Sequence, residues 1–137
     1  MVGILLVTHG DFAEGIKNST ELIVGKLEKF TALGLYQGDS IDDFNKKVLN
    51  YVIELDDGNG VLVFSDLYCA TPFNSTVVNN TELKGHNYRS ISGVNLPMLI
   101  EALTCRDNMN LEELSEYVMD IGKNGIKELF KEMSNRK

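Results

Sequence analysis

Short apolar runs alternate along this chain with stretches of helical periodicity, and this alternation constrains the fold more than any other feature. The runs lie at about 2–8, 30–36, 61–65 and 88–94. Runs of this length, bounded by turn residues, are typical of strands buried in a parallel sheet. Because helical stretches separate them, we predict an α/β protein in which right-handed crossovers place helices on both faces of a mostly parallel sheet.

The helical stretches have recognisable starts and stops. We expect helices over about 11–27, from 41 to the glycine-rich turn at 56–60, from 71 onward, from 96 to about 106, and around 111–121. Ser40 with Asp43 forms a capping-box-like start, and Thr71 is the expected N-cap before Pro72. The tail at 126–130 fits either a short antiparallel fifth strand or a last helical turn. The apolar stripe of the first helix is expected to comprise Phe12, Ile16, Leu22 and Ile23.

The expected strand order, numbered along the chain, is 2-1-3-4. In this order the connections leave strands 1 and 3 toward opposite sides, so a crevice opens between their carboxyl ends, where open α/β sheets place their ligands. His9 follows the first strand and Asp66 follows the third. The sequence therefore predicts that a histidine and an aspartate 57 positions apart meet in one crevice.

This pair has a defined chemistry. A carboxylate that accepts one imidazole N–H fixes the tautomer and stabilises positive charge on the ring, which leaves the other nitrogen free. His9 could then act as a base toward a nearby hydroxyl or thiol, or be the nucleophile itself. The helix that begins near Thr71 would aim backbone N–H groups at an anionic group on His9. The turn at 93–98 is a candidate for the other side of the site.

Composition and motifs exclude several classes of function. The 137 residues suit one domain, 1–137, and the net charge of −7 provides no basic stripe for nucleic acid or for an anionic membrane. The first apolar run is too short to span a membrane and lacks signal-peptide flanks. Cys69 and Cys105 fit no metal spacing and are read as reduced thiols of a cytoplasmic protein. We expect no metal, because the chain has one usable histidine and no histidine–cysteine cluster, and no cofactor, because no dinucleotide glycine motif follows the first strand.

The second histidine, His86, is expected in a surface turn.

Three motifs together resemble a known family. They are Thr8-His9-Gly10 after the first strand, Asp66 followed by Thr71-Pro72-Phe73-Asn74, and the segment from Gly93 to Met98. In this order, on a matching βα pattern, they are similar to the enzyme IIA component of the mannose family of the bacterial sugar phosphotransferase system. The resemblance extends over nearly the whole chain.

The resemblance implies a phosphocarrier that accepts a phosphoryl group from HPr and donates it to a IIB component during sugar uptake. It implies that His9 is phosphorylated at Nε2 and that Asp66 orients the ring through Nδ1. It further implies a homodimer, often with an exchanged C-terminal strand, that meets the membrane only through the transporter complex. The IIB component is expected on a separate chain. The residues expected to bind the phosphoryl group are Thr71, Phe73 and Asn74, with support from Thr8, Gly10 and Asn95.

One departure and two alternatives accompany this interpretation. Family members usually carry two glycines where this chain has Cys69-Ala70, and glycine alone adopts positive φ without strain. The first alternative is the phosphocarrier subunit of dihydroxyacetone kinase, which uses a similar histidine. The second is a receiver-like signalling domain phosphorylated on Asp66, although the acidic pair and the lysine that such a domain needs are not evident.

Overall fold

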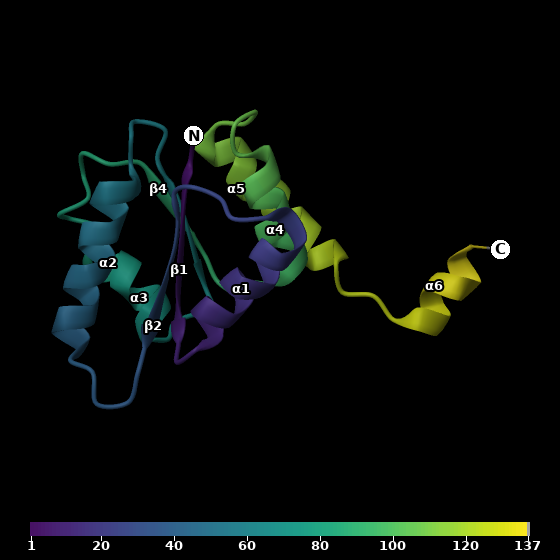
Figure 1. Ribbon diagram of the computed structural model, residues 1–137, viewed down its shortest axis with the longest axis horizontal. Coiled ribbons are helices and arrows are strands. Elements are labelled where there is room, and N and C mark those ends of the chain that lie inside the picture. The colour runs from purple at the N-terminus through teal and green to yellow at the C-terminus, as the bar shows by residue number, and fades with distance from the viewer. Residues whose placement is uncertain (137) are drawn as a thin grey trace.

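A computed structural model of the chain describes residues 1–136, and Figure 1 shows its arrangement. The strands are β1 (Gly3–His9), β2 (Phe30–Leu35), β3 (Val61–Ser65) and β4 (Tyr88–Ile91). The helices are α1 (Phe12–Val24), α2 (Ile41–Leu55), α3 (Thr71–Val78), α4 (Leu96–Cys105), α5 (Leu111–Asn124) and α6 (Leu129–Asn135). The structure thus has the alternation of strands and helices that the sequence predicts.

The four strands form one parallel sheet in the order β2-β1-β3-β4, which confirms the predicted order. Leu5 of β1 lies opposite Thr31 of β2 and Val63 of β3. This register brings the carboxyl ends of β1 and β3 together, so the loops that carry His9 and Asp66 leave the sheet side by side. The tail that the sequence left open forms helix α6 and adds no strand to the sheet within residues 1–136.

Helices cover both faces of the sheet (Figure 1). Helices α1, α4 and α5 pack on one face, and α2 and α3 lie on the other. Ile4 and Leu6 of β1 point toward the first group, whereas Leu5 and Val7 point toward the second. Successive strand residues face opposite sides. Both sides of β1 are therefore apolar, and no residue in it before His9 is exposed.

The predicted apolar stripe of α1 is wrong in three of its four residues. Only Ile16 is buried, whereas Phe12, Leu22 and Ile23 are exposed. The residues that pack inward beside it are the small Ala13 and Thr20. Thr20 can be buried because its hydroxyl donates a hydrogen bond to the carbonyl of Ile16, one turn earlier (2.7 Å).

A buried arginine joins three segments at the amino-terminal edge of the sheet. Arg106, just past α4, is 3% exposed. Its guanidinium donates to the carbonyl oxygens of Val2 (3.3 Å), Lys29 (2.9 Å) and Glu28. Burial lowers the pKa of Arg106. All three of these hydrogen bonds have backbone carbonyl groups, and not carboxylates, as acceptors. The end opposite His9 is therefore closed by polar contacts.

Helix α6 stands away from the rest of the molecule at the end of an extended segment (Figure 1). None of its residues is buried, and Leu129, Phe130 and Met133 are all more than half exposed. Among residues 1–136, no helix combines the length and the apolar character that crossing a membrane requires.

Candidate functional site

His9 and Asp66 meet at the carboxyl edge of the sheet, as the sequence predicts. Oδ2 of Asp66 accepts a hydrogen bond from the backbone N–H of His9 (2.9 Å) and lies 2.8 Å from Nδ1 of its ring. The two contacts fix both the backbone and the ring of His9 against one carboxylate. The Asp66 side chain is 13% exposed and the His9 side chain 49% exposed. The carboxylate is thus shielded while the imidazole faces solvent.

This geometry determines the tautomer of the neutral ring. An ionised carboxylate only accepts hydrogen bonds, so the proton lies on Nδ1 and the lone pair on Nε2. Burial raises the pKa of Asp66, but the hydrogen bonds from the backbone and ring of His9 lower it by more, so the pKa lies below its ordinary value. Asp66 is therefore ionised at neutral pH and can stabilise positive charge on the ring.

The β1–α1 loop holds His9 through Thr8 and Gly10. The buried hydroxyl of Thr8 accepts a hydrogen bond from the N–H of Ala13 (2.7 Å), which ties the end of β1 to the first turn of α1. Gly10 has φ +53° and donates its N–H to the carbonyl of Leu35 (2.7 Å). Its carbonyl oxygen lies so close to Gly34 that a Cβ there would collide with it. Thr8 and Gly10 shape the loop and therefore position the histidine indirectly.

The β3–α3 loop differs from the prediction at its helix cap. Ala70, and not Thr71, is the N-cap of α3, and no side chain caps this helix. Thr71 and Phe73 are half-buried residues of its first turn, and Asn74 is exposed. The Asn74 amide donates to the carbonyl of Cys69 (3.0 Å), so it braces the loop.

Cys69 stands where the resembling family usually has glycine, and the backbone there requires left-handed geometry. Its φ is +63°, a conformation that costs a non-glycine residue about 1–2 kcal/mol. The thiol is exposed, and both cysteines of the chain are free. Cys69 therefore adopts a backbone conformation that glycine adopts more readily.

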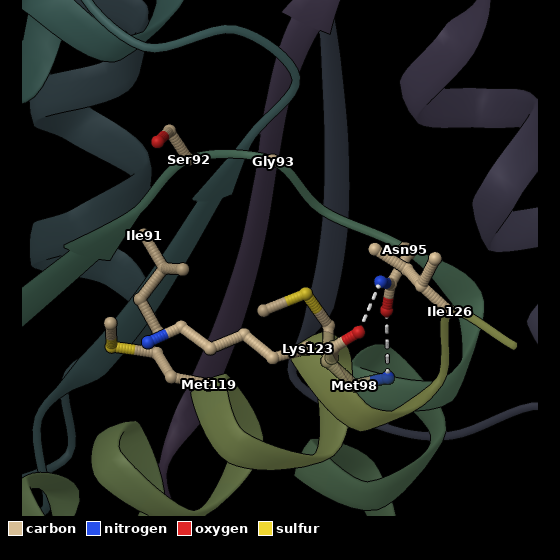
Figure 2. Close-up of a pocket in the computed structure, with 9 residues that line it drawn as sticks. Ile91, Ser92, Gly93, Asn95, Met98, Met119, Lys123 and Ile126 are labelled. Atoms are coloured by element: carbon tan, nitrogen blue, oxygen red, sulfur yellow. Dashed lines mark hydrogen bonds between the residues drawn. The ribbon is translucent and has the colours of Figure 1, made fainter.

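Asn95 begins α4 and does not leave its amide free for a ligand. Its Oδ1 accepts from the N–H of Met98 (3.2 Å), and its Nδ2 donates to the carbonyl of Gly122 (2.9 Å), as Figure 2 shows. The preceding turn is joined to the end of β3 by a hydrogen bond from Val94 N–H to the Ser65 carbonyl (3.0 Å). Asn95 thus supports the edge of the site by joining α4 to α5.

A small cavity of about 150 Å³ lies beside this turn (Figure 2). Its walls include Ile91, Met98 and Met119, and the side chain of Lys123 extends past Met98 toward Ile91 and Met119. His9 and Asp66 do not line it. The cavity is therefore a feature separate from the histidine–aspartate pair.

Two features near His9 were missed by sequence reasoning. The Tyr36 hydroxyl donates to Oδ1 of Asp11 (2.7 Å), which joins the loops after β1 and β2, and this hydrogen bond raises the pKa of Tyr36. After Asp66, Leu67 and Tyr68 are more than 60% exposed, and the Tyr68 ring lies 5.1 Å from that of Phe73. Tyr36 directly follows β2, and Leu67 and Tyr68 come shortly after β3, so their place at this sheet edge was readable from the sequence, whereas their contacts with Asp11 and Phe73 were not.

His86 is less free than the predicted surface turn suggests. Its Nδ1 lies 2.7 Å from Oδ2 of Asp56, and its side chain is 29% exposed. Oδ1 of Asp56 also accepts from the N–H groups of Gly58 and Gly60. Across residues 1–136, no cluster of three or more histidine, cysteine, aspartate or glutamate side chains could hold a metal ion.

The fold and the paired histidine place the chain in a class of α/β proteins with a solvent-facing imidazole at a topological switch point, and comparison with known proteins narrows this class. A family model described as PTS system fructose IIA component matches residues 3–119. The mannose-specific EIIAB component of Escherichia coli K12 is 31% identical over 131 residues, which are 93% of this chain and 39% of that protein. The chain thus spans about two fifths of that relative's length.

Other relatives are of similar length to this chain. The fructose-specific EIIA component of Bacillus subtilis is 27% identical over 83% of this chain and 77% of that protein. The crystal structure of an EIIA component from Streptococcus agalactiae superimposes with a TM-score of 0.88 at 32% identity, covering 96% and 99% of the two chains. The chain belongs to the mannose/fructose family of EIIA components of the phosphotransferase system.

Proposed function

We propose that the chain is a phosphohistidine carrier that takes up and passes on a phosphoryl group at Nε2 of His9. The observation that carries the proposal is the 2.8 Å contact between Nδ1 of His9 and Asp66, which leaves Nε2 with the free lone pair on a half-exposed ring. Membership of the EIIA family supports it, because EIIA components belong to a phosphotransferase system.

The bond changes follow from this geometry. The Nε2 lone pair attacks phosphorus while the bond from phosphorus to the donor nitrogen breaks and its electron pair returns to the donor. The proton stays on Nδ1, so the phosphorylated ring carries a positive charge that Asp66 stabilises. Thr71 and Phe73, in the first turn of α3, are proposed to receive the phosphoryl oxygens, because a helix N-terminus favours negative charge. Asn74 contributes by bracing this loop.

The proposed donor is phosphorylated HPr and the proposed acceptor is a IIB component of a mannose-family transporter, with transfer coupled to sugar uptake. Residues 1–137 would act as one phosphocarrier domain in the cytoplasm and reach the membrane only as part of the transporter complex. The curated relatives include mannose-, fructose- and sorbose-specific components. The family therefore supports this pathway without specifying the sugar.

The test is to incubate the protein with phosphorylated HPr and to map the product by mass spectrometry. The expected product is an acid-labile, base-stable phosphate on His9. His9→Ala should take no label, whereas His86→Ala, which removes the other histidine, should be labelled normally. Label that persists in His9→Ala, or no label on the wild-type protein, would rule out the carrier function.

The alternatives have less support. In a receiver-like domain Asp66 would be the nucleophile, but Oδ2 of Asp66 is occupied by two hydrogen bonds from His9. The dihydroxyacetone kinase branch would use His9 in the same way. Transfer to purified IIB, measured beside transfer to the kinase, separates that branch from sugar uptake.

We also propose that the chain forms a homodimer through its C-terminal arm, residues 126–135. A seven-residue helix is not stable in water by itself. The arm exposes four apolar side chains, those of Ile126, Leu129, Phe130 and Met133. A second copy would cover them. Sedimentation should show a dimer for the wild type and a monomer for Leu129→Asp/Phe130→Asp, and identical sedimentation of the two proteins would rule out this interface.

A further inference from the structure

A polar cavity of about 410 Å³ lies beside the second histidine, along the outer strand β4 and the loop that precedes it. Its lining includes three nitrogen-bearing side chains, those of Lys84, His86 and Arg89. Within residues 1–136, no aspartate or glutamate lines it. The chain has 13 lysine and arginine residues against 20 aspartate and glutamate residues, so the charge around this cavity is the reverse of that of the whole chain.

The two permanent cations of this cavity form no salt bridge within residues 1–136. The guanidinium of Arg89 donates to Oδ1 of Asn87 and to the carbonyl of Tyr88, at 3.0 Å each, and both hydrogen bonds come from Nη1. Its Nε and Nη2 have no partner in the described part of the chain and therefore keep their N–H donors for a ligand. Lys84 is exposed, so its ammonium can turn toward the cavity without losing a partner.

His86 adds a third donor, and Asp56 fixes its orientation. Nδ1 of His86 lies 2.7 Å from Oδ2 of Asp56, whose side chain is 8% exposed. Because this contact uses Nδ1, Nε2 is the ring nitrogen that remains for a ligand. A protonated imidazole donates from both nitrogens, so Nε2 can donate to an anion while Asp56 stabilises the positive charge of the ring. The cavity thus combines an ammonium, a guanidinium and an imidazole.

The free edge of β4 supplies backbone donors to the same cavity. Strand β4 is the outermost strand of the sheet, and one of its edges pairs with no other strand in residues 1–136. The carbonyl of Asn87 accepts from the N–H of Val61 in β3 (3.0 Å), so Asn87 directs its backbone groups into the sheet. Successive residues of a strand direct these groups to opposite edges, so Tyr88 and Ser90, which line the cavity, direct theirs outward. Unpaired N–H groups at the edge of a sheet favour anions.

We propose that this cavity binds the phosphate group of a small, hydroxyl-rich phosphate ester. Cationic side chains and backbone N–H groups gathered at one place are the donors that phosphate oxygens require. A phosphate ester presents three terminal oxygens, one for each of the three side chains, whereas a carboxylate presents two. The cavity is separate from His9, so the inference goes beyond the carrier function and does not depend on it.

The rest of the lining suits the hydroxyl groups of such an ester. A cavity of this volume holds a small organic molecule, so a phosphate ion alone would occupy only part of it. Oδ1 of Asn80 accepts from the Tyr88 hydroxyl (3.0 Å), which leaves the amide N–H groups of Asn80 for a ligand. The Ser90 hydroxyl accepts from that of Thr76 (2.9 Å) and keeps its own O–H to donate. Asn80 and Ser90 are therefore the residues that would donate to the hydroxyl oxygens of the ester.

The test follows the two histidine rings by NMR while a phosphate ester is added. The chain contains 2 histidines, so a long-range proton–nitrogen spectrum has one set of ring signals for each, and His9→Ala assigns them. Glucose 6-phosphate, added at constant ionic strength, should shift the His86 signals saturably in the wild type and in His9→Ala alike. Glucose at the same concentrations should not shift them. Inorganic phosphate should shift the same signals with an affinity roughly threefold to tenfold lower, because it lacks the hydroxyl contacts.

A matched pair of variants locates the binding. Lys84→Gln/Arg89→Gln removes two positive charges from the cavity, whereas Lys46→Gln/Lys47→Gln removes two from exposed positions of α2 that do not line it. The first variant should bind glucose 6-phosphate at least about tenfold more weakly, because it loses charge-assisted hydrogen bonds to the phosphate. The control has the same change in net charge and an intact cavity, so its affinity should stay within about twofold of the wild type.

Unshifted His86 signals, equal shifts with glucose, or equal affinities of the two variants would each overturn the proposal. Shifts confined to His9 would mean that the ester binds at the carrier site, and they would overturn it as well. An affinity for inorganic phosphate equal to that for the ester would show that the hydroxyl groups are not recognised, and the assignment of an ester would then be wrong. The comparison of the ester with glucose uses the wild-type protein, so it remains decisive even if a variant fails to fold.

Discussion

At the scale of single residues, the chain contains two histidine–aspartate pairs with different environments. His9 and His86 each place Nδ1 within 2.8 Å of a carboxylate, but the His9 side chain is 49% exposed and that of His86 is 29% exposed. The first pair follows strands β1 and β3 at the carboxyl edge. The second joins the loops before β3 and β4 at the other edge. Position in the sheet, and not the pairing itself, marks the first pair as the candidate site.

This difference predicts that the same aspartate-to-asparagine substitution slows phosphoryl transfer in the first pair and leaves it unchanged in the second. Asp66→Asn should reduce the rate of phosphoryl transfer to His9 by about 10²–10⁴-fold, because an amide does not stabilise positive charge on the ring. Asp56→Asn should leave that rate within about twofold of the wild type. Rapid-quench labelling with phosphorylated HPr measures both. A similar loss in the two variants would show that the transfer defect is a general effect of destabilising the fold.

Asp56→Asn should instead change the pH dependence of stability. Burial raises the pKa of Asp56, but hydrogen bonds from His86, Gly58 and Gly60 lower it by more, so the folded pKa lies below the ordinary value of about 3.9. A lowered pKa stabilises the folded state above the unfolded pKa, and this contribution is lost as the pH falls through the folded pKa. The variant should lose about 1–2 kcal/mol of unfolding free energy at pH 7. Urea titrations from pH 7 to pH 3 should show the gap narrowing below about pH 4, and a constant gap would contradict the assignment.

At the scale of elements, the loop that presents His9 depends on the absence of a side chain in β2. A Cβ at Gly34 would collide with the carbonyl oxygen of Gly10. Gly34→Ala should therefore destabilise the protein by about 1–3 kcal/mol and slow transfer to His9, since the displaced loop carries the imidazole. Gly15→Ala is the control, because its Cβ meets nothing within 4 Å and alanine favours the helix. Urea denaturation of both variants tests this, and equal stabilities would show that the loop yields without cost.

The elements also show what local sequence could predict. Strands β1 and β3 were predictable because they are buried on both faces and are therefore apolar up to their last residues. The inner face of α1 was not, because close packing on the sheet selects the small Ala13, while the apolar Leu22 remains 88% exposed. The cap of α3 was misassigned to Thr71, since the chain enters this helix through Cys69 at positive φ. The spacing of apolar residues indicates which side chains could face the core. It does not indicate how closely a helix packs against the sheet, and this distance selects small residues such as Ala13.

At the scale of the whole molecule, the sequence predicts that His9 and Asp66 meet, but it does not predict the C-terminal helix or the contacts between loops. The crossover rule and the strand order bring His9 and Asp66 together without reference to any side-chain contact. Helix α6 could not be assigned from the sequence, because a short segment with exposed apolar residues takes its conformation from whatever packs on it. The Tyr36–Asp11 contact joins loops 25 positions apart and has no local signature. Contacts that follow from the order of strands in the sheet can therefore be predicted from the sequence. Contacts that depend on a binding partner or on the geometry of loops cannot.

Arg106 joins three segments of the chain at the edge of the sheet opposite His9. These hydrogen bonds lead to a prediction for the stability of the whole molecule. Its guanidinium satisfies carbonyl oxygens from positions 2, 28 and 29, so it joins the start of β1 and the α1–β2 loop to the end of α4. Arg106→Met should cost about 2–4 kcal/mol, because buried carbonyls lose their donors. Arg106→Lys should recover only part of this, since an ammonium cannot reproduce the planar fork. Arg89→Met is the control: within residues 1–136 its guanidinium bonds only to the neighbouring Asn87 and Tyr88, so its loss should stay below about 1 kcal/mol. Equal urea midpoints for the two methionine variants would contradict this prediction. They would mean that water replaces the guanidinium at this edge and that apolar packing alone stabilises it.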